Sequence, residues 1–179
     1  MIRLFFGLEL PGELRMRIAA ISTGIDRARW VAPENLHITL RFVGEVEEPA
    51  MEYIAGEAAA IRFEPFPVTL SGAGHFERGG RVSAVWLGVE STPALAGLRD
   101  RIEAAAVRAG QPPEGRKFRP HVTVARFNRG RPGEVRHWLA ANSLFRAVPF
   151  TVARFALFSS MLGRSGPNYR VEWLFPPEE

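Results

Sequence analysis

The stretch HITL at residues 37–40 recurs 84 residues later as HVTV at residues 121–124. Three further pairs of segments repeat at this offset or close to it: LRMRI at 14–18 with LRDRI at 98–102, PFPV at 65–68 with PFTV at 149–152, and FGLE at 6–9 with LGVE at 87–90. Several matches at one spacing indicate an internal duplication. The repeated halves are roughly 1–80 and 81–179.

Each half predicts the same order of elements: strand, helix, strand, helix, strand. The expected strands lie at 3–10, 37–43, 66–74, 82–89, 121–127 and 150–159, with a final strand at 169–175. The expected helices lie at 11–28, 49–61, 93–109 and 132–142. We therefore expect one α+β domain of residues 1–179. Its two βαβαβ lobes, related by a pseudo-two-fold axis, would place two largely antiparallel sheets around a central cleft with the helices outside.

The repeated His-x-Thr motif places two polar side chains on one face of each predicted strand. Residues two apart on a strand share a face, so His37 lies with Thr39 and His121 lies with Thr123. Pseudo-symmetry would bring these imidazoles and hydroxyls together across the cleft. That set suits phosphoester hydrolysis without a metal. One imidazole would accept a proton from water, the other would donate one to the leaving oxygen, and the hydroxyls would bind phosphate oxygens.

A metal site is the main chemical alternative to this interpretation. A catalytic zinc usually takes three protein ligands, whereas the motifs offer two imidazoles and weakly ligating hydroxyls. The other histidines, His75 and His137, have no repeat partner and are expected to be surface or structural residues. Composition does not exclude a Ser/His/Asp triad, but a GxSxG elbow is missing. We expect neither a metal nor a cofactor.

Composition narrows the function classes further. The absence of cysteine excludes disulfide scaffolds, thiolate nucleophiles and cysteine-ligated metals. Basic minus acidic residues give 9 − 12 = −3 up to Glu90 and 14 − 7 = +7 after it. The excess of positive charge after Glu90 allows an anionic partner, although a solvated arginine-rich surface explains this excess as well. Glu9 and Pro11 interrupt the apolar N-terminal run, so we expect no signal peptide or membrane span and a cytoplasmic location.

The two motifs differ at their C-terminal ends. Arg41 comes directly after the first motif, whereas Ala125 separates Arg126 from the second. Strict alternation would place Arg41 on the His37 face and Arg126 on the face away from His121. A β-bulge at the extra residue would turn Arg126 back toward the cleft. Without a bulge, Arg126 would end the strand in solvent.

Four segments of the chain resemble the bacterial and archaeal RNA 2′,3′-cyclic phosphodiesterases, also called 2′-5′ RNA ligase-like proteins, of the two-histidine phosphoesterase superfamily: RLFFGLELP, RWVAPENLHITLRFVG, KFRPHVTVARF and LFSSMLGRSGPNYRVEWLF. The resemblance covers nearly the whole chain. It implies a bilobal α+β fold. It also implies an enzyme that opens a terminal 2′,3′-cyclic phosphate on RNA, without metal, to leave a 2′-phosphate. It further implies His37 as proton donor to the leaving 3′-oxygen, His121 as proton acceptor from water, and Thr39, Thr123 and Arg126 as phosphate-binding residues.

The expected function is therefore hydrolysis of RNA or nucleoside 2′,3′-cyclic phosphate ends by paired-histidine acid–base catalysis. Two alternatives are 2′-5′ RNA ligation at the same site and a non-catalytic RNA- or nucleotide-binding module. The acid and base roles can exchange with substrate orientation. We expect the protein to be a monomer whose partners are RNA ends. We expect no membrane or protein partner. Aromatic residues near the motifs could stack on bases but are more often core residues: Trp30, Phe42, Phe118 and Phe127.

Overall fold

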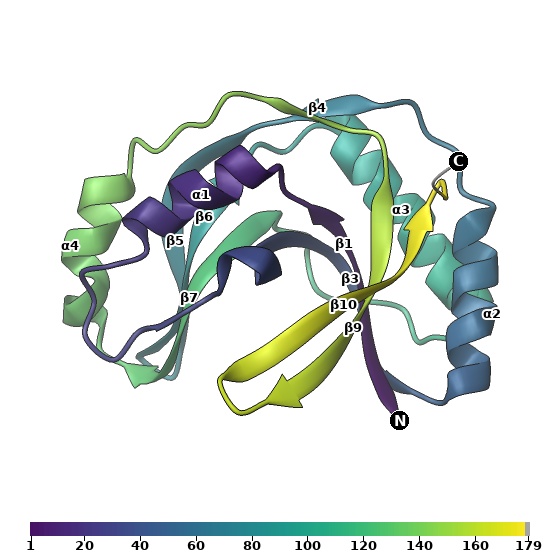
Figure 1. Ribbon diagram of the computed structural model, residues 1–179, viewed down its shortest axis with the longest axis horizontal. Coiled ribbons are helices and arrows are strands. Elements are labelled where there is room, and N and C mark those ends of the chain that lie inside the picture. Colours follow the sequence, from purple (N-terminus) through teal and green to yellow (C-terminus); the bar gives the residue numbers. More distant parts are fainter. Residues whose placement is uncertain (178–179) are drawn as a thin grey trace.

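The computed structural model describes residues 1–177, and two four-stranded antiparallel sheets form its centre (Figure 1). The first sheet has the order β10-β9-β1-β3 and the second the order β2-β7-β6-β5. Their bounds are β1 (Ile2–Glu9), β2 (Arg29–Trp30), β3 (His37–Val46), β5 (Leu70–Arg78), β6 (Arg81–Val89), β7 (His121–Gly130), β9 (Phe155–Gly163) and β10 (Gly166–Phe175). A small third sheet pairs β4 (Phe66–Val68) with β8 (Phe150–Val152).

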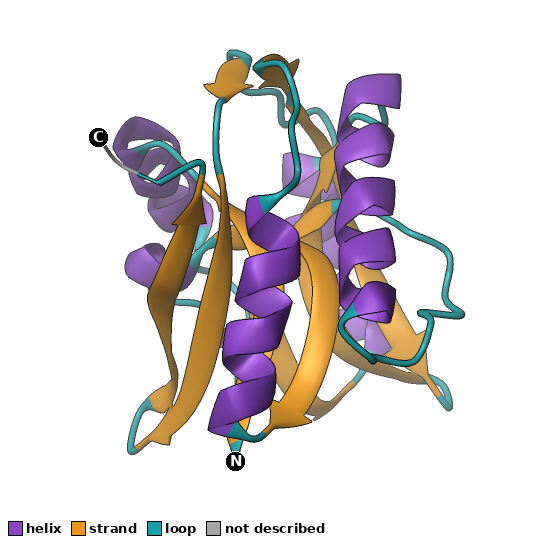
Figure 2. Cartoon of the chain, turned by 90° about the vertical axis from the view of Figure 1, so that its right-hand side faces the viewer, coloured by secondary structure: helices purple, strands orange, loops and turns teal. Residues whose placement is uncertain are grey.

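The helices lie outside the sheets (Figure 1) and run roughly along the strands that they cover (Figure 2). Helices α1 (Gly12–Ile21) and α4 (Pro132–Asn142) flank the second sheet, and α2 (Glu48–Ala59) and α3 (Pro93–Arg108) flank the first. A short 3₁₀ helix, η1 (Pro33–Asn35), precedes β3. The expected α+β architecture is therefore confirmed. Within residues 1–177, no helix combines the length and the apolar character that crossing a membrane requires.

Local sequence signals explain where these elements form. Thr92 caps α3, because its hydroxyl accepts the backbone N–H of Leu95 at 3.2 Å, and Pro93 suits the first turn. Buried residues then follow at intervals of three or four along one face of this helix, including Leu98 and Ile102. Strand β1 instead buries the five consecutive residues 4–8, because both of its faces are covered.

Helix α1 ends seven residues before the predicted end at residue 28. The hydroxyl of Ser22 donates to the carbonyl of Ile18 at 2.8 Å, and Gly24 adopts a left-handed backbone with φ of +89°. Both features terminate a helix. Ile25 is nevertheless buried, so the apolar periodicity that suggested a longer helix continues in a loop that packs on the core.

Each sheet contains strands from both halves of the sequence. Strand β5 belongs to the first half but pairs with β6, and β9 belongs to the second half but pairs with β1. The sheets therefore differ from the expectation that lobes follow the boundary near residue 80. Gly79 and Gly80, both at positive φ, form the tight turn between β5 and β6. Such a turn forces the two strands to be neighbours in one sheet.

Candidate active site

The two His-x-Thr motifs open equivalent strands of the two sheets. β3 begins at His37, β7 begins at His121, and the two strands contact each other. In both motifs the residue after the histidine is fully buried, whereas the histidine and the threonine line one cavity of about 570 Å³. Arg126 lines this cavity too. The structure therefore brings together all five residues that the sequence predicted for the site.

A backbone carbonyl two residues upstream orients each imidazole. Nδ1 of His37 lies 2.6 Å from the carbonyl oxygen of Asn35, and Nδ1 of His121 lies 2.6 Å from that of Arg119. Because a carbonyl oxygen can only accept, each Nδ1 carries a proton and donates it. The neutral rings therefore keep their lone pair at Nε2, the atom available for proton transfer.

The two Nε2 atoms differ in their surroundings. The hydroxyl of Thr39 donates to Nε2 of His37 at 2.9 Å. In the part of the chain that the structure describes, no hydrogen bond engages Nε2 of His121. The lone pair of His121 is therefore open to a water molecule, whereas Thr39 already restrains the ring of His37.

Burial lowers the pKa of both imidazoles. It lowers the pKa of His37 from 6.5 to about 4, with smaller lowering by the positive charges of Arg126 and His121, against the raising effect of the Asn35 carbonyl. Burial and then Arg126 also lower the pKa of His121, against the effect of its carbonyl partner. Both rings are therefore mainly neutral at pH 7. Arg126 acts on both because all three side chains line one cavity.

A β-bulge follows the His-x-Thr motif in both strands. The pairing register shifts at Leu40 of β3 and at Val124 of β7. Val124 and Ala125 are both buried, and the next residue, Arg126, turns into the cavity. The bulge hypothesis for Arg126 is thus confirmed.

The bulge in β3 also corrects the expectation for Arg41. Alternation predicted this residue on the His37 face, but its side chain is 5% exposed and its guanidinium pairs with Glu103 of α3. It also donates to the carbonyl oxygens of Phe42 and Pro112. Arg41 contributes to the cavity wall, but its charge is matched by a carboxylate. Phe42 takes the position equivalent to Arg126 and lines the cavity with 52% of its surface exposed.

Aromatic rings surround both histidines. Phe5 and Tyr169 pack against His37, with ring centroids 4.8 and 5.1 Å away. Phe76 and Trp86 pack against His121, at 4.9 and 5.9 Å. These rings exclude water from the imidazoles and so cause much of the desolvation. Sequence reasoning missed them, because they come from strands far from the motifs in the chain.

A glycine in the neighbouring strand lies close to each motif. A Cβ atom on Gly7 would lie 2.7 Å from the carbonyl oxygen of Ile38 and 3.6 Å from the His37 ring. A Cβ atom on Gly88, which pairs with His121, would lie 2.5 Å from the carbonyl oxygen of Ser71. The two glycines belong to the repeated FGLE and LGVE segments. That repeat was the available signal for their role, which is to let neighbouring backbone approach.

Of the remaining candidates, the other two histidines lie outside the cavity and the four aromatic residues divide between the core and the cavity. Nε2 of His75 is 2.8 Å from a carboxylate oxygen of Glu77, and His137 is exposed on α4; neither lines the cavity. Phe127 belongs to the core and Trp30 packs against it. Phe118 lines the cavity, as Phe42 does. Within residues 1–177, no three His, Asp or Glu side chains form a group that could hold a metal ion.

Residues 10–163 match the family model of the 2′-5′ RNA ligase superfamily. The chain is 38% identical over 159 residues to the RNA 2′,3′-cyclic phosphodiesterase of Aeropyrum pernix, which covers 87% of this chain and 89% of that protein. It is 31% identical over 172 residues to the RNA 2′,3′-cyclic phosphodiesterase of Archaeoglobus fulgidus, covering 94% and 97%.

Solved structures agree with this similarity. The crystal structure of Escherichia coli LigT in complex with 3′-AMP superimposes with a TM-score of 0.79 at 30% identity, over 97% of each chain. A crystal structure described as a phosphoesterase superimposes with a TM-score of 0.80 at 29% identity, again over 97% of each chain. The likeness therefore extends over both sheets and all the helices that surround them.

Proposed function

The chain belongs to the 2′-5′ RNA ligase superfamily, and from that premise we propose that it is a phosphodiesterase that hydrolyses 2′,3′-cyclic phosphate ends of RNA to 2′-phosphates. The observation that carries the proposal is the pair of imidazoles in one cavity. Each imidazole is held by a backbone carbonyl at Nδ1, and Arg126 lines the same cavity. The names of the relatives in Aeropyrum pernix and Archaeoglobus fulgidus support the same reaction.

In the proposed reaction, Nε2 of His121 accepts a proton from water. The water oxygen forms a bond to phosphorus, and the bond from phosphorus to the 3′-oxygen breaks. Nε2 of His37 donates its proton to that leaving oxygen, which becomes the 3′-hydroxyl, and the 2′-phosphate remains. The open lone pair of His121 supports its role as base. Proton exchange with solvent returns both rings to their starting states.

The bound phosphodiester favours the protonated form of His37, which is the form that acts as the acid. Burial lowers the pKa of His37 to about 4, which disfavours the imidazolium. A phosphodiester anion beside the ring raises this pKa, because an opposite charge stabilises the charged form. Arg126 and the hydroxyls of Thr39 and Thr123 line the cavity where they can bind the non-bridging oxygens. The exposed ring of Phe42 offers a face on which the base of the same nucleotide can stack.

The test is hydrolysis of a nucleoside 2′,3′-cyclic phosphate in EDTA by the wild-type protein and by His37→Ala and His121→Ala. Each variant should lose about 10²- to 10⁴-fold in kcat, the usual contribution of one acid or base group. His137→Ala, at an exposed histidine outside the cavity, is the matched control and should keep full activity. Chromatography against 2′- and 3′-phosphate standards identifies the product.

Each alternative function predicts a different result. Undiminished turnover in either histidine variant would refute the paired-histidine mechanism, and loss of wild-type turnover in EDTA would indicate a metal. A non-catalytic binding module would bind the cyclic phosphate without turnover. Ligation uses the same site with the 5′-hydroxyl of a second RNA in place of water. Formation of a 2′-5′ linkage from a cyclic-phosphate RNA and a 5′-hydroxyl RNA would reveal it.

A further inference from the structure

The cavity that holds the paired histidines is also lined by positively charged residues, which together we call the positively charged wall. Arg99 of α3 and three residues of the loop before β7, Arg116, Lys117 and Arg119, line this wall. Among the described lining residues, Glu114 is the one carboxylate, and it pairs with Arg116 at 3.3 Å. The wall therefore carries positive charge in addition to Arg126, more than a single phosphate group requires.

Arg99 is the most unusual of these residues. Only 14% of its side chain is exposed, and its Nε is buried without a hydrogen-bond partner. Its guanidinium lies over the ring of Phe118, 5.6 Å from the ring centre. The nearest carboxylate oxygen, on the largely exposed Asp100, is 3.6 Å from Nη1, and the charge of Arg99 also lowers the pKa of Glu103, a carboxyl that is already paired with Arg41. A buried guanidinium with unmet hydrogen-bonding capacity is costly, and an incoming anion would compensate that cost.

The covalent structure of a nucleotide indicates which anion could reach this wall. In a terminal nucleotide the 2′- and 3′-oxygens lie on one edge of the ribose. The base and the 5′-carbon leave from the opposite edge. With the cyclic phosphate between His37 and His121, both groups therefore point away from the histidines. Phe42 and the loop before β7 line the same cavity as the histidines, and Arg41 joins them by donating to the carbonyl oxygens of Phe42 and Pro112.

We propose that Arg99, with Lys117 and Arg119, forms a second phosphate subsite that binds the 5′-phosphoryl group of the terminal nucleotide. This inference rests on the proposed function, because it takes the cyclic phosphate as bound between the histidines. Guanidinium groups match two phosphate oxygens at once, and Lys117 adds an exposed cation on a long side chain. In an RNA strand the 5′-phosphoryl group is the link to the preceding nucleotide. The subsite therefore favours polynucleotide ends over free nucleosides.

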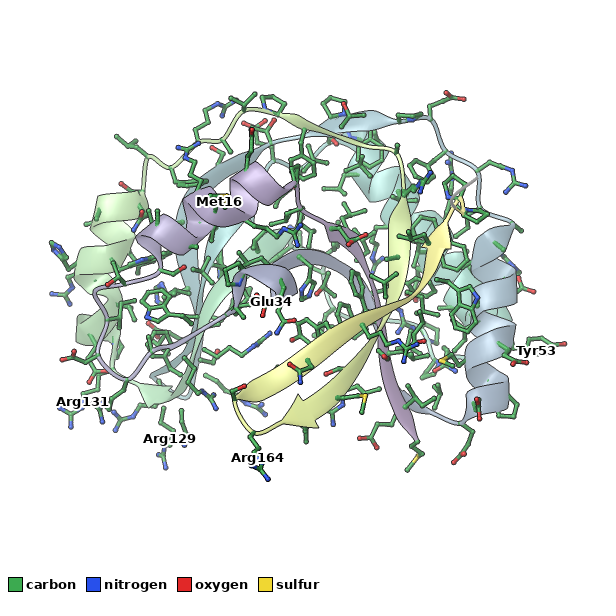
Figure 3. All side chains as sticks on the ribbon, in the orientation of Figure 1. Met16, Glu34, Tyr53, Arg129, Arg131 and Arg164 are labelled. Atoms are coloured by element: carbon green, nitrogen blue, oxygen red, sulfur yellow. The ribbon has the colours of Figure 1, made fainter. Side chains whose placement is uncertain are left out.

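The experiment compares binding of two product-like probes by calorimetry, adenosine 2′-monophosphate and adenosine 2′,5′-bisphosphate. Wild-type protein should bind the bisphosphate at least about 10-fold more tightly, as expected for a charge-assisted phosphate contact. Arg99→Gln should reduce this Kd ratio to about 1, and Lys117→Gln, at an exposed residue that is safe for folding, should reduce it about threefold. Arg164→Gln is the matched control, because Arg164 points into solvent at the β9–β10 turn (Figure 3).

A dinucleotide with a 2′-phosphate end separates the two sources of a 5′-phosphoryl group. Tight binding of the dinucleotide assigns the subsite to the strand linkage, whereas tight binding of the bisphosphate alone assigns it to a free 5′-phosphate. A wild-type ratio near 1, or a ratio that survives both substitutions, would overturn the subsite. A different result would refute the proposed function alone. In that case the wild-type protein would bind the bisphosphate more tightly than the monophosphate but would not hydrolyse cyclic phosphates. If the wild-type protein bound neither probe, both the subsite and the proposed function would be contradicted.

Discussion

The strand that begins at His37 and the strand that begins at His121 share one backbone plan through the bulge, although the buried fifth residue is Arg41 in the first and Ala125 in the second. Both histidines donate from Nδ1 to a carbonyl two residues upstream, and both strands bulge after the threonine. At the sixth residue the two copies diverge. The first presents Phe42 to the cavity and the second presents Arg126.

This divergence has a chemical explanation. The reaction centre of a cyclic phosphate needs an acid and a base on opposite sides of phosphorus, which a pseudo-symmetric pair of histidines provides. The substrate itself is asymmetric, with an aromatic base at one end and an anionic phosphate at the other. An aromatic ring suits the base and a guanidinium suits the phosphate. A duplicated site can therefore keep its catalytic pair while its flanking positions specialise.

Outside the two histidines, removing the charge of Arg126 should cause the largest loss of activity. Arg126→Gln should lower kcat by about 10²- to 10³-fold, because a positioned donor on developing charge contributes on that scale. Arg126→Lys should retain part of the activity, since it keeps the charge but not the planar fork. Arg129→Gln is the control on the same strand, because Arg129 points away from the molecule (Figure 3). Full activity in Arg126→Gln would show that β7 does not supply a phosphate-binding charge that β3 lacks.

The partner of Arg41 should matter for stability. Glu103→Gln leaves a buried guanidinium without its carboxylate, and it also weakens the contact at 2.8 Å with the backbone N–H of Glu114. The free energy of unfolding in urea should fall by roughly 3–5 kcal/mol. Glu45→Gln, which removes a half-exposed pair with Arg3, should cost at most about 1 kcal/mol. Equal losses in the two variants would be inconsistent with a buried pair at Arg41.

Removing the ring of Phe42 should affect substrate binding more than the chemical step. Phe42→Ala should raise KM about 10-fold or more with a smaller change in kcat, because stacking one base contributes roughly 1–3 kcal/mol. Phe42→Trp should keep a low KM. Tyr53→Ala is the control, since Tyr53 is an exposed aromatic residue that points into solvent from α2 (Figure 3). If kcat falls instead while KM is unchanged, Phe42 does not bind the base.

The pH profile should show the smallest but most diagnostic effect. The acid must be protonated and the base neutral, and the pKa of each imidazole in the free enzyme lies below 6.5. The profile of kcat/KM should therefore be bell-shaped with its maximum below pH 6.5, and kcat/KM should fall severalfold by pH 7.5. Arg126→Gln should shift the profile to higher pH, because Arg126 lowers both pKa values. A wild-type maximum above pH 7.5 would contradict the proposed protonation states.

Several features were predictable because they depend on local patterns. The repeat identified His37 and His121, and alternation along a strand placed each histidine beside its threonine. The position of Arg126 needed a hypothesis about backbone geometry. The same geometry in β3 went unrecognised, since no extra residue in that motif signals a bulge. The direction of Arg41 was therefore predicted wrongly, and Phe42 was expected mainly as a core residue.

The sequence by itself determined the duplication, the four helices and the two imidazoles, because periodicity and repetition are local properties of a chain. The third strand predicted in each half, at 66–74 and at 150–159, is instead two strands in the structure, β4 with β5 and β8 with β9. Only the tertiary structure decided how strands from the two halves combine into each sheet, which rings enclose each histidine, and that Glu103 matches the charge of Arg41. The physical reason is that these outcomes depend on pairing register and on burial between distant segments. Both are set by how the whole core packs, and a single register shift changes which side chain faces the cavity.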